Sequence, residues 1–290
     1  MNASKCMKEM RRFPARGGQG RALSRLQLAF TLIELLVVIT IIGIVAAISV
    51  PAIKNFNKAD ADAAATRQLL DDIARARQFA ISHRSTVYMT FVPSDFWTLP
   101  GFNFNSFTLE QKTIISNLLA RQMIGYNFIS LRDVGDQLGQ PFPKYLSEWR
   151  SLPEGMFICT NKFMRSSDTL VMYDPFNPPR PGYPTITTYS VRGFDTNIVP
   201  FPTADSPIYL NFPCLTFNSN GQLVSNDQRE EEIIPLARGK AILSLDANKR
   251  PFFSRPTLEE NPPGNSTNAY TLIVVDSLTG RAHVEHQTPQ

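Results

Sequence analysis

A single stretch of apolar sequence constrains this chain more than any other feature. It covers 21 residues, from Phe30 to Val50, and Glu34 is its only charged residue. About 20 apolar residues, rising about 1.5 Å each in a helix, span a hydrocarbon core of about 30 Å. The sequence therefore predicts a membrane-spanning α-helix over residues 30–50, with one carboxylate near its start.

The carboxylate of Glu34 is costly in such a helix. A charged side chain near the bilayer centre costs about 2.5–3.5 kcal/mol on insertion scales, and less near the edge, where Glu34 lies. Two interpretations are open at this point. Glu34 either reaches the interface and complements the positive end of the helix dipole, or it is retained because it binds a cation on another molecule.

Residues 1–29 form a basic leader. They hold seven Lys or Arg residues and one acid, Glu9, for a net charge of +6. The positive-inside rule predicts that this leader stays in the cytoplasm and that the chain after Pro51 lies across the membrane. Without the leader, 22 basic and 24 acidic residues remain, a net charge of about −2. This balance argues against a strongly basic nucleic-acid binder.

The junction between leader and apolar stretch carries a recognisable motif. Ala29 followed by Phe30-Thr31-Leu32-Ile33-Glu34-Leu35-Leu36 resembles the processing and methylation motif of type IV prepilins and type II secretion pseudopilins. The resemblance implies cleavage between Ala29 and Phe30, with N-methylation of Phe30. It also implies that Glu34 pairs with the new terminal amine of a neighbouring subunit. Ala29 stands where the family usually has glycine, and Pro51 matches the family's helix-kinking proline.

The same resemblance implies partners and a location. The partners are a prepilin peptidase and methyltransferase, other pseudopilins in a hetero-oligomeric filament tip, and an inner-membrane assembly platform. The protein would cross the bacterial inner membrane once, with a cytoplasmic N-terminus and a head that is periplasmic or assembled in a pseudopilus. Two alternatives remain for residues 30–50. One is an ordinary secretory signal cut near Val45-Ala46-Ala47, and the other is a plain anchor that is never processed.

After Pro51 the sequence becomes amphipathic. Apolar or small residues recur at spacings of three and four, with most charged residues elsewhere on the helical wheel. The pattern predicts that the helix continues to about residue 85 with one face packed on a globular head, for a total length of about 80 Å. The residues predicted to face the head are Ile53, Phe56, Ala59, Ala63, Thr66, Leu70, Ile73, Ala76 and Ala80.

Four later segments indicate a β-rich head. Residues 86–92 alternate as a strand, with Val87, Met89 and Phe91 on one face. The segment 69–81 followed by this strand resembles the H-type pseudopilin and FimT-like minor pilin family. The turn at 152–156, the hairpin at 215–223 and a closing hairpin at 270–284, turned at 278–280, resemble later parts of that family.

We therefore predict an α+β, pilin-like fold, in which a long N-terminal helix, half transmembrane and half amphipathic, packs on a C-terminal antiparallel β-sheet head. The expected divisions are a cleaved leader (1–29), a transmembrane helix (30–50), an amphipathic helix (51–85) and a head (86–290). Residues 93–150 are predicted to be a partly helical insertion, which is either a small cap or a contact surface. A capping box of Thr108 with Gln111 opens its helix, and Gly125 is expected to stop it.

Residues with the chemistry for catalysis or metal binding are few. Cys159 and Cys214 form either a possible disulfide or two separately buried side chains. His283, Glu285 and His286 lack a fourth ligand, so we expect no metal and no cofactor. The FimT-like DNA-uptake role calls for a basic cluster, and the tail after Thr279 offers only Arg281, so nucleic acid is not expected.

The sequence thus favours a structural subunit and not an enzyme: a minor pseudopilin of a type II secretion system. The alternatives are a minor pilin of a type IV pilus, or a membrane-anchored or secreted enzyme.

Overall fold

The computed structural model describes residues 32–132, 136, 142–164, 169–173, 188–225, 230–248, 251–268 and 271–286. Side chains of residues 47–60 are outside this description. The chain divides into two compact units, Met1–Ala52 and Ile53–Gln290. The leader and the junction between Ala29 and Phe30 lie outside the described residues. The fold class is α+β with antiparallel sheets, which confirms that part of the prediction.

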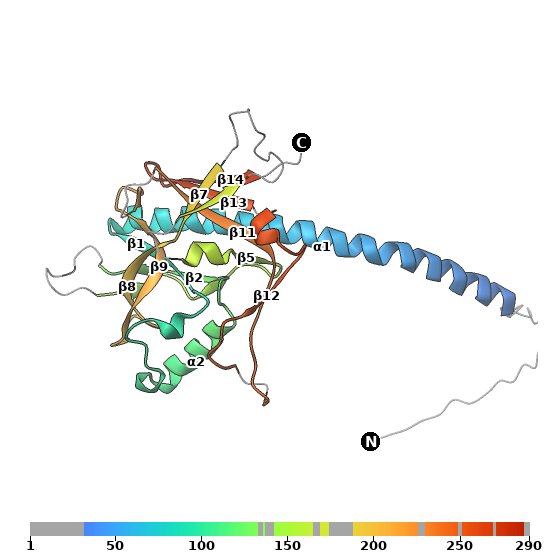
Figure 1. Ribbon diagram of the computed structural model, residues 1–290, viewed down its shortest axis with the longest axis horizontal. Helices are drawn as coiled ribbons and strands as arrows, with labels where there is room; N and C mark the ends of the chain where they lie inside the picture. The colour runs from blue at the N-terminus through green and yellow to red at the C-terminus, as the bar shows by residue number, and fades with distance from the viewer. Residues whose placement is uncertain are drawn as a thin grey trace, which may run out of the picture. The chain divides into compact units, whose positions relative to one another are not determined.

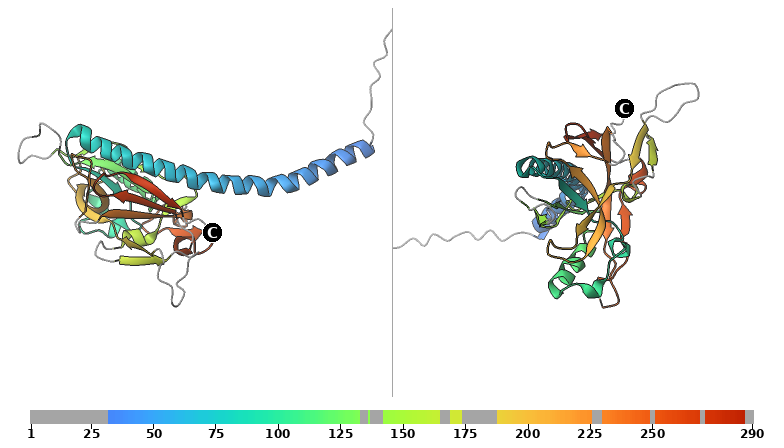
Figure 2. Two further views of the ribbon diagram at one scale, coloured as in Figure 1. Left: turned by 90° about the horizontal axis from the view of Figure 1, so that it is seen from above. Right: turned by 90° about the vertical axis from the view of Figure 1, so that its left-hand side faces the viewer.

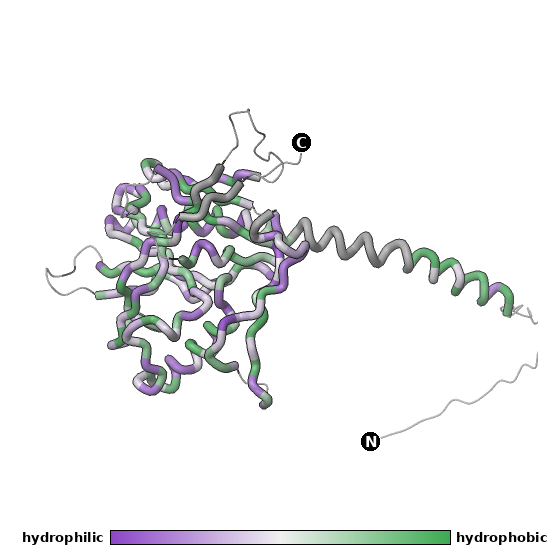
Figure 3. The backbone as a smooth tube through the Cα atoms, in the orientation of Figure 1, coloured by the Kyte–Doolittle hydropathy of each residue, from purple (hydrophilic) through white to green (hydrophobic). Residues whose placement is uncertain are grey.

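The first described element is the long helix α1, Leu32–His83. Its described N-terminal part is predominantly apolar (Figure 3). No helix among the described residues is long and apolar enough to cross a membrane. The transmembrane helix predicted over 30–50 is therefore not shown, and that stretch lies partly outside the described residues.

The first sheet of the head is built around β1 (Val87–Phe91). In the described part of the chain it has seven antiparallel strands, in the order β10-β9-β1-β2-β3, with β4 also paired to β2 and β8 to β9. Figure 1 labels β1, β2, β8 and β9 of this sheet. Val87 stands opposite both Ser130 of β2 and Phe217 of β9, which fixes the register at the centre. The other strands are β2 (Gly125–Ser130), β3 (Lys144–Tyr145), β4 (Arg150–Ser151), β8 (Asp195–Pro200), β9 (Tyr209–Phe217) and β10 (Leu223–Val224).

The second sheet is centred on β11 (Glu231–Ile242). Five described strands form it in the order β12-β11-β13-β14, and β5 also pairs with β11. A separate antiparallel pair joins β6 (Thr169–Tyr173) to β7 (Thr188–Arg192). The remaining strands are β5 (Met156–Ile158), β12 (Thr257–Glu260), β13 (Thr271–Asp276) and β14 (Ala282–His286). The short helices are η1 (Phe96–Thr98), η2 (Phe104–Ser106), α2 (Leu109–Leu119), η3 (Thr160–Phe163) and α3 (Asn265–Asn268).

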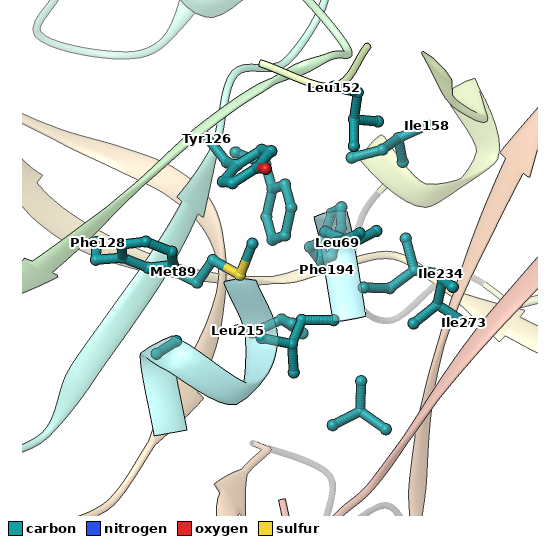
Figure 4. Close-up of a cluster of buried hydrophobic side chains, with 14 of the residues drawn as sticks. Leu69, Met89, Tyr126, Phe128, Leu152, Ile158, Phe194, Leu215, Ile234 and Ile273 are labelled. Atoms are coloured by element: carbon teal, nitrogen blue, oxygen red, sulfur yellow. The ribbon is translucent and has the colours of Figure 1, made fainter. Parts of the chain in front are cut away.

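The head portion of α1 supplies one wall of the main hydrophobic core. Leu69 lies among side chains from both sheets, including Met89, Leu215 and Ile234 (Figure 4). This portion of the helix lies along one side of the strands (Figure 2). Its fully buried positions are Ala65, Leu69, Ile73, Ala76 and Ala80.

The face of α1 predicted to pack on the head overlaps the buried face but does not coincide with it. Thr66, Ile73, Ala76 and Ala80 are buried as expected. Ala63 is exposed and Leu70 is only half-buried, because the face centres instead on Ala65 and Leu69. The predicted contacts of Ile53, Phe56 and Ala59 lie outside the described residues.

The segment predicted as an insertion, 93–150, contributes strands to the first sheet. It contains β2, β3 and the first residue of β4, and β2 pairs with the whole length of β1. The Thr108–Gln111 capping box is confirmed, but α2 already ends at Leu119. Gly125 does not stop that helix; it opens β2, where a Cβ atom would lie 2.7 Å from the Arg121 carbonyl oxygen.

The remainder of the segment forms a second core. Aromatic side chains of η1, η2 and the following loop pack with α2 and with Phe201 and Phe212. The rings of Phe201 and Phe212 are stacked with centroids 4.9 Å apart. This aromatic cluster joins α2 to the β8–β9 side of the first sheet, so α2 and the aromatic residues before it are continuous with the head.

The predicted hairpins are confirmed. β9 and β10 pair across the turn at 218–221, and β13 pairs with β14. In the closing hairpin, Gly280 has φ 62° and its amide donates to the Asp276 carbonyl at 2.8 Å. Gly155, φ 98°, similarly leads into β5. A positive φ favours glycine, which accounts for both residues.

Candidate processing and assembly site

Of the residues predicted for processing and assembly, Glu34 lies in the described part of α1. Ala29 and Phe30 lie outside the described residues. Glu34 is in the first turn of the helix, and it is exposed. The exposed amides of a helix N-terminus carry partial positive charge, so a carboxylate is favourable there.

Around Glu34 the surface of the helix is apolar on all sides. The exposed fractions of its large apolar side chains range from 82% for Leu32 to 40% for Val38, without a buried face among residues 32–46. The one hydroxyl with a described contact in this stretch, Thr40, donates to the Leu36 carbonyl at 2.8 Å, so its hydrogen-bonding needs are met within the helix. A contiguous apolar surface of this kind marks a site that lipid or another protein covers.

Pro51 lies inside α1, which continues to His83. Proline removes one backbone donor and crowds the preceding turn. The side chain of Pro51 is outside the described residues, and the predicted kink stays a prediction.

Two buried carboxylates attach the head portion of α1 to the sheets, and the sequence pattern missed both. The first is Asp62, whose Oδ2 lies 2.9 Å from Nη2 of Arg238 on β11. Its Oδ1 accepts a hydrogen bond from the Thr271 hydroxyl on β13 at 3.3 Å. The helical pattern placed most charged residues away from the packed face, but Asp62 lies on that face, where a cation and a hydroxyl satisfy its carboxylate.

The second is Asp72, which is 3% exposed. It accepts a hydrogen bond from the Tyr126 hydroxyl at 2.6 Å and lies 3.1 Å from Nε of Arg150. Gln68, one turn earlier, donates to the same hydroxyl at 2.7 Å and to the Ser151 carbonyl at 2.8 Å. Burial, and then the adjacent Asp72 carboxylate, raises the pKa of Tyr126. The group stays a neutral donor, and the helix is held to β2 and β4.

The two cysteines do not form the disulfide considered from the sequence. Cys159 and Cys214 are both free and buried. Cys159 packs in a small cluster with Met123, whereas the thiol of Cys214 lies 3.7 Å from the Thr216 hydroxyl. Burial raises the pKa of each thiol to about 12. The alternative of two separately buried side chains describes the structure.

A buried ion pair also escaped the sequence analysis. Lys162 is fully buried, and its Nζ contacts Oε1 of Glu232 and donates to the Arg192 carbonyl at 2.9 Å. The same Nζ lies 4.7 Å from the centre of the Phe194 ring. The pair joins η3 to β11 and β7. No local sequence motif predicts this ion pair, because Lys162 and Glu232 are 70 residues apart.

The tail residues considered as metal ligands are only partly described. His283 and Glu285 lie on β14, with Nε2 and Oε1 3.6 Å apart, and the side chain of His286 lies outside the described residues. Among the residues that the structure describes, no group of three or more His, Cys, Asp or Glu side chains is arranged for a metal ion.

Comparison with known proteins bears on the N-terminus. Residues 24–50 match the prokaryotic N-terminal methylation motif. The matched segment includes the Ala29–Phe30 junction and Glu34. No curated protein and no solved structure matches the chain.

Proposed function

We propose that this chain is a type IV pilin-like protein or pseudopilin processed by prepilin peptidase, a class that the methylation motif supports. More specifically, we propose a minor pseudopilin of a type II secretion system, of the H-type. In this role it is a structural subunit and not an enzyme. The single observation that carries the proposal is the motif at 24–50, which contains both the cleavage junction and Glu34.

The geometry of the described helix supports this role. Cleavage before Phe30 would create a positive terminal amine four residues ahead of Glu34. A carboxylate in an apolar setting needs a cation nearby, and the amine of a neighbouring subunit supplies one. The apolar surface of residues 32–46 would then be covered first by lipid and afterwards by neighbouring helices.

The proposed partners follow from the same sequence of events. They are the prepilin peptidase and methyltransferase, an inner-membrane assembly platform, and other pseudopilins. The proposed location is the inner membrane with a periplasmic head, consistent with the membrane-anchored, periplasm-facing proteins that carry this motif. A minor pilin of a type IV pilus has the same N-terminus and is the alternative.

Mass spectrometry of the mature protein tests the processing step. We expect an N-terminus at methylated Phe30, and Ala29→Leu should abolish cleavage while Ala29→Gly preserves it. A mature N-terminus near Ile48 would instead identify an ordinary secretory signal. An uncut chain would identify a plain anchor.

Glu34→Val tests the assembly step. The variant should be inserted and cleaved but recovered poorly in filaments, because the terminal amine of its neighbour loses its partner. Thr40→Val, in the same apolar stretch, is the matched control and should assemble normally. Normal assembly of Glu34→Val would refute the pairing of Glu34 with an amine. Deletion of the gene distinguishes the two systems: loss of exoprotein secretion supports the proposal, and loss of surface pili supports the alternative.

A further inference from the structure

The residue after α1 has an unusual backbone conformation. Arg84 has φ 47°, and α1 closes on it through bonds from the Arg84 amide to the Ile81 carbonyl and from the Ser85 amide to the Ala80 carbonyl. Helices commonly end on such a left-handed residue, and it is usually glycine because a side chain is strained there. An arginine in this position is therefore retained at a cost. Strained residues of this kind cluster at functional sites.

Arg84 forms one side of a cleft of about 540 Å³ at the C-terminal end of α1. Arg132, which follows β2, also lines the cleft, and both arginines are exposed. Ser85 connects the two segments, because its hydroxyl donates to the Arg132 carbonyl and lies 3.1 Å from the Ser130 hydroxyl. The other polar lining residues, Thr86, Tyr88 and Ser219, all carry hydroxyls.

The charged side chains among the described lining residues of this cleft are both positive. Among the described residues that line it, none is a carboxylate. Among the residues that the structure describes, neither guanidinium forms an ion pair. The negative end of the helix dipole favours a cation at Arg84, but it explains neither the choice of arginine over glycine nor the presence of Arg132. Two guanidinium groups beside several hydroxyls form a setting for oxyanions, which arginine binds with paired hydrogen bonds.

We infer that this arginine cleft, defined by Arg84 and Arg132, binds the carboxylates of an acidic segment on a partner protein. Two cations in one cleft match two neighbouring carboxylates. A nucleic acid would call for a longer track of phosphate contacts and exposed aromatic platforms. Among the described residues that line this cleft, Tyr88 is the one aromatic residue, and it is half-buried. The inference does not depend on the N-terminal assembly role.

Binding of a labelled peptide of alternating glycine and glutamate tests the inference. It is measured by fluorescence anisotropy on the full-length protein in a neutral detergent, with a peptide carrying glutamine in place of glutamate as the control. We expect the acidic peptide to bind, more weakly at high salt, and the glutamine peptide not to bind. Arg84→Gln and Arg132→Gln should each weaken binding about tenfold. Arg75→Gln, an exposed arginine elsewhere on α1, should leave the Kd unchanged.

Arg84→Gly separates recognition from folding. Glycine adopts the left-handed conformation without strain, so this variant should melt at the same or a higher temperature while losing affinity for the acidic peptide. Failure of the acidic peptide to bind, or an unchanged Kd in the Arg84 and Arg132 variants, would overturn the inference. Tighter binding of a short labelled oligonucleotide, lost in the same variants, would also overturn it and assign the cleft to nucleic acid.

Discussion

The helix α1 contains two stretches of similar local structure and opposite surroundings. Residues 32–46 expose apolar side chains on every side, whereas residues 61–83 bury one face, centred on Leu69 and Ile73, against two sheets. The apolar surface of the first stretch is of the kind that lipid or another molecule covers, as in the proposed assembly role. The second stretch packs against strands of the same chain. The same secondary structure thus carries the proposed intermolecular contact in one stretch and the packing of the head in the other.

Truncating one leucine in each stretch should give the largest contrast. Leu69→Ala leaves a cavity between the sheets and should lower the free energy of unfolding by about 2–5 kcal/mol. Leu36→Ala removes an exposed side chain and should leave that free energy unchanged within about 0.5 kcal/mol. Urea unfolding of the detergent-solubilised chain measures both. Equal destabilisation by the two variants would remove the distinction between the stretches.

Removing the buried carboxylate of Asp72 should have an intermediate effect. Asp72→Ala leaves the Tyr126 hydroxyl with Gln68 alone and Arg150 without its counterion, so we expect a loss of about 1–3 kcal/mol. The adjacent Asp71 is exposed, and Asp71→Ala is the matched control with little expected change. The same urea titration measures both variants. If Asp72→Ala and Asp71→Ala have the same free energy of unfolding, apolar packing alone holds the helix to the head.

The smallest effect is expected at the thiols. Burial raises the pKa of Cys159 and Cys214 to about 12, so at pH 8 both remain protonated and shielded from solvent. A thiol reagent should react with them only after unfolding, while a cysteine introduced at exposed Ser82 should react at once. The time course of thiolate release by the reagent measures this difference. Rapid reaction of Cys159 or Cys214 in the folded chain would contradict this expectation and show that the head opens locally around these thiols.

Local patterns in the sequence were sufficient for several elements. The alternation of Val87, Met89 and Phe91 predicted β1, and Thr108 with Gln111 predicted the start of α2. Gly280 marked the closing hairpin because its turn requires a positive φ. In each case the physical cause lies within a few residues of the element, so the sequence alone carries the information.

The place of residues 93–150 could not be derived in that way. Residues 125–130 are all buried, so β2 lacks the polar alternation that identifies a half-exposed strand. Only the pairing of Phe128 with Met89 and its neighbours makes this segment a central strand. Similarly, Asp62 and Asp72 look like solvent-facing acids until Arg238, Thr271 and Tyr126 are brought beside them.

The apolar and helical character of residues 32–46, the basic composition of residues 1–29 and the motif that contains Glu34 can be read from the chain alone, because each depends on neighbouring residues. The burial of particular acids, the separation of the two cysteines and the cleft shared by Arg84 and Arg132 emerge only in the folded head. Those features depend on residues tens to hundreds of positions apart. Their free energies arise from desolvation and charge pairing, which exist only once the sheets have assembled around α1.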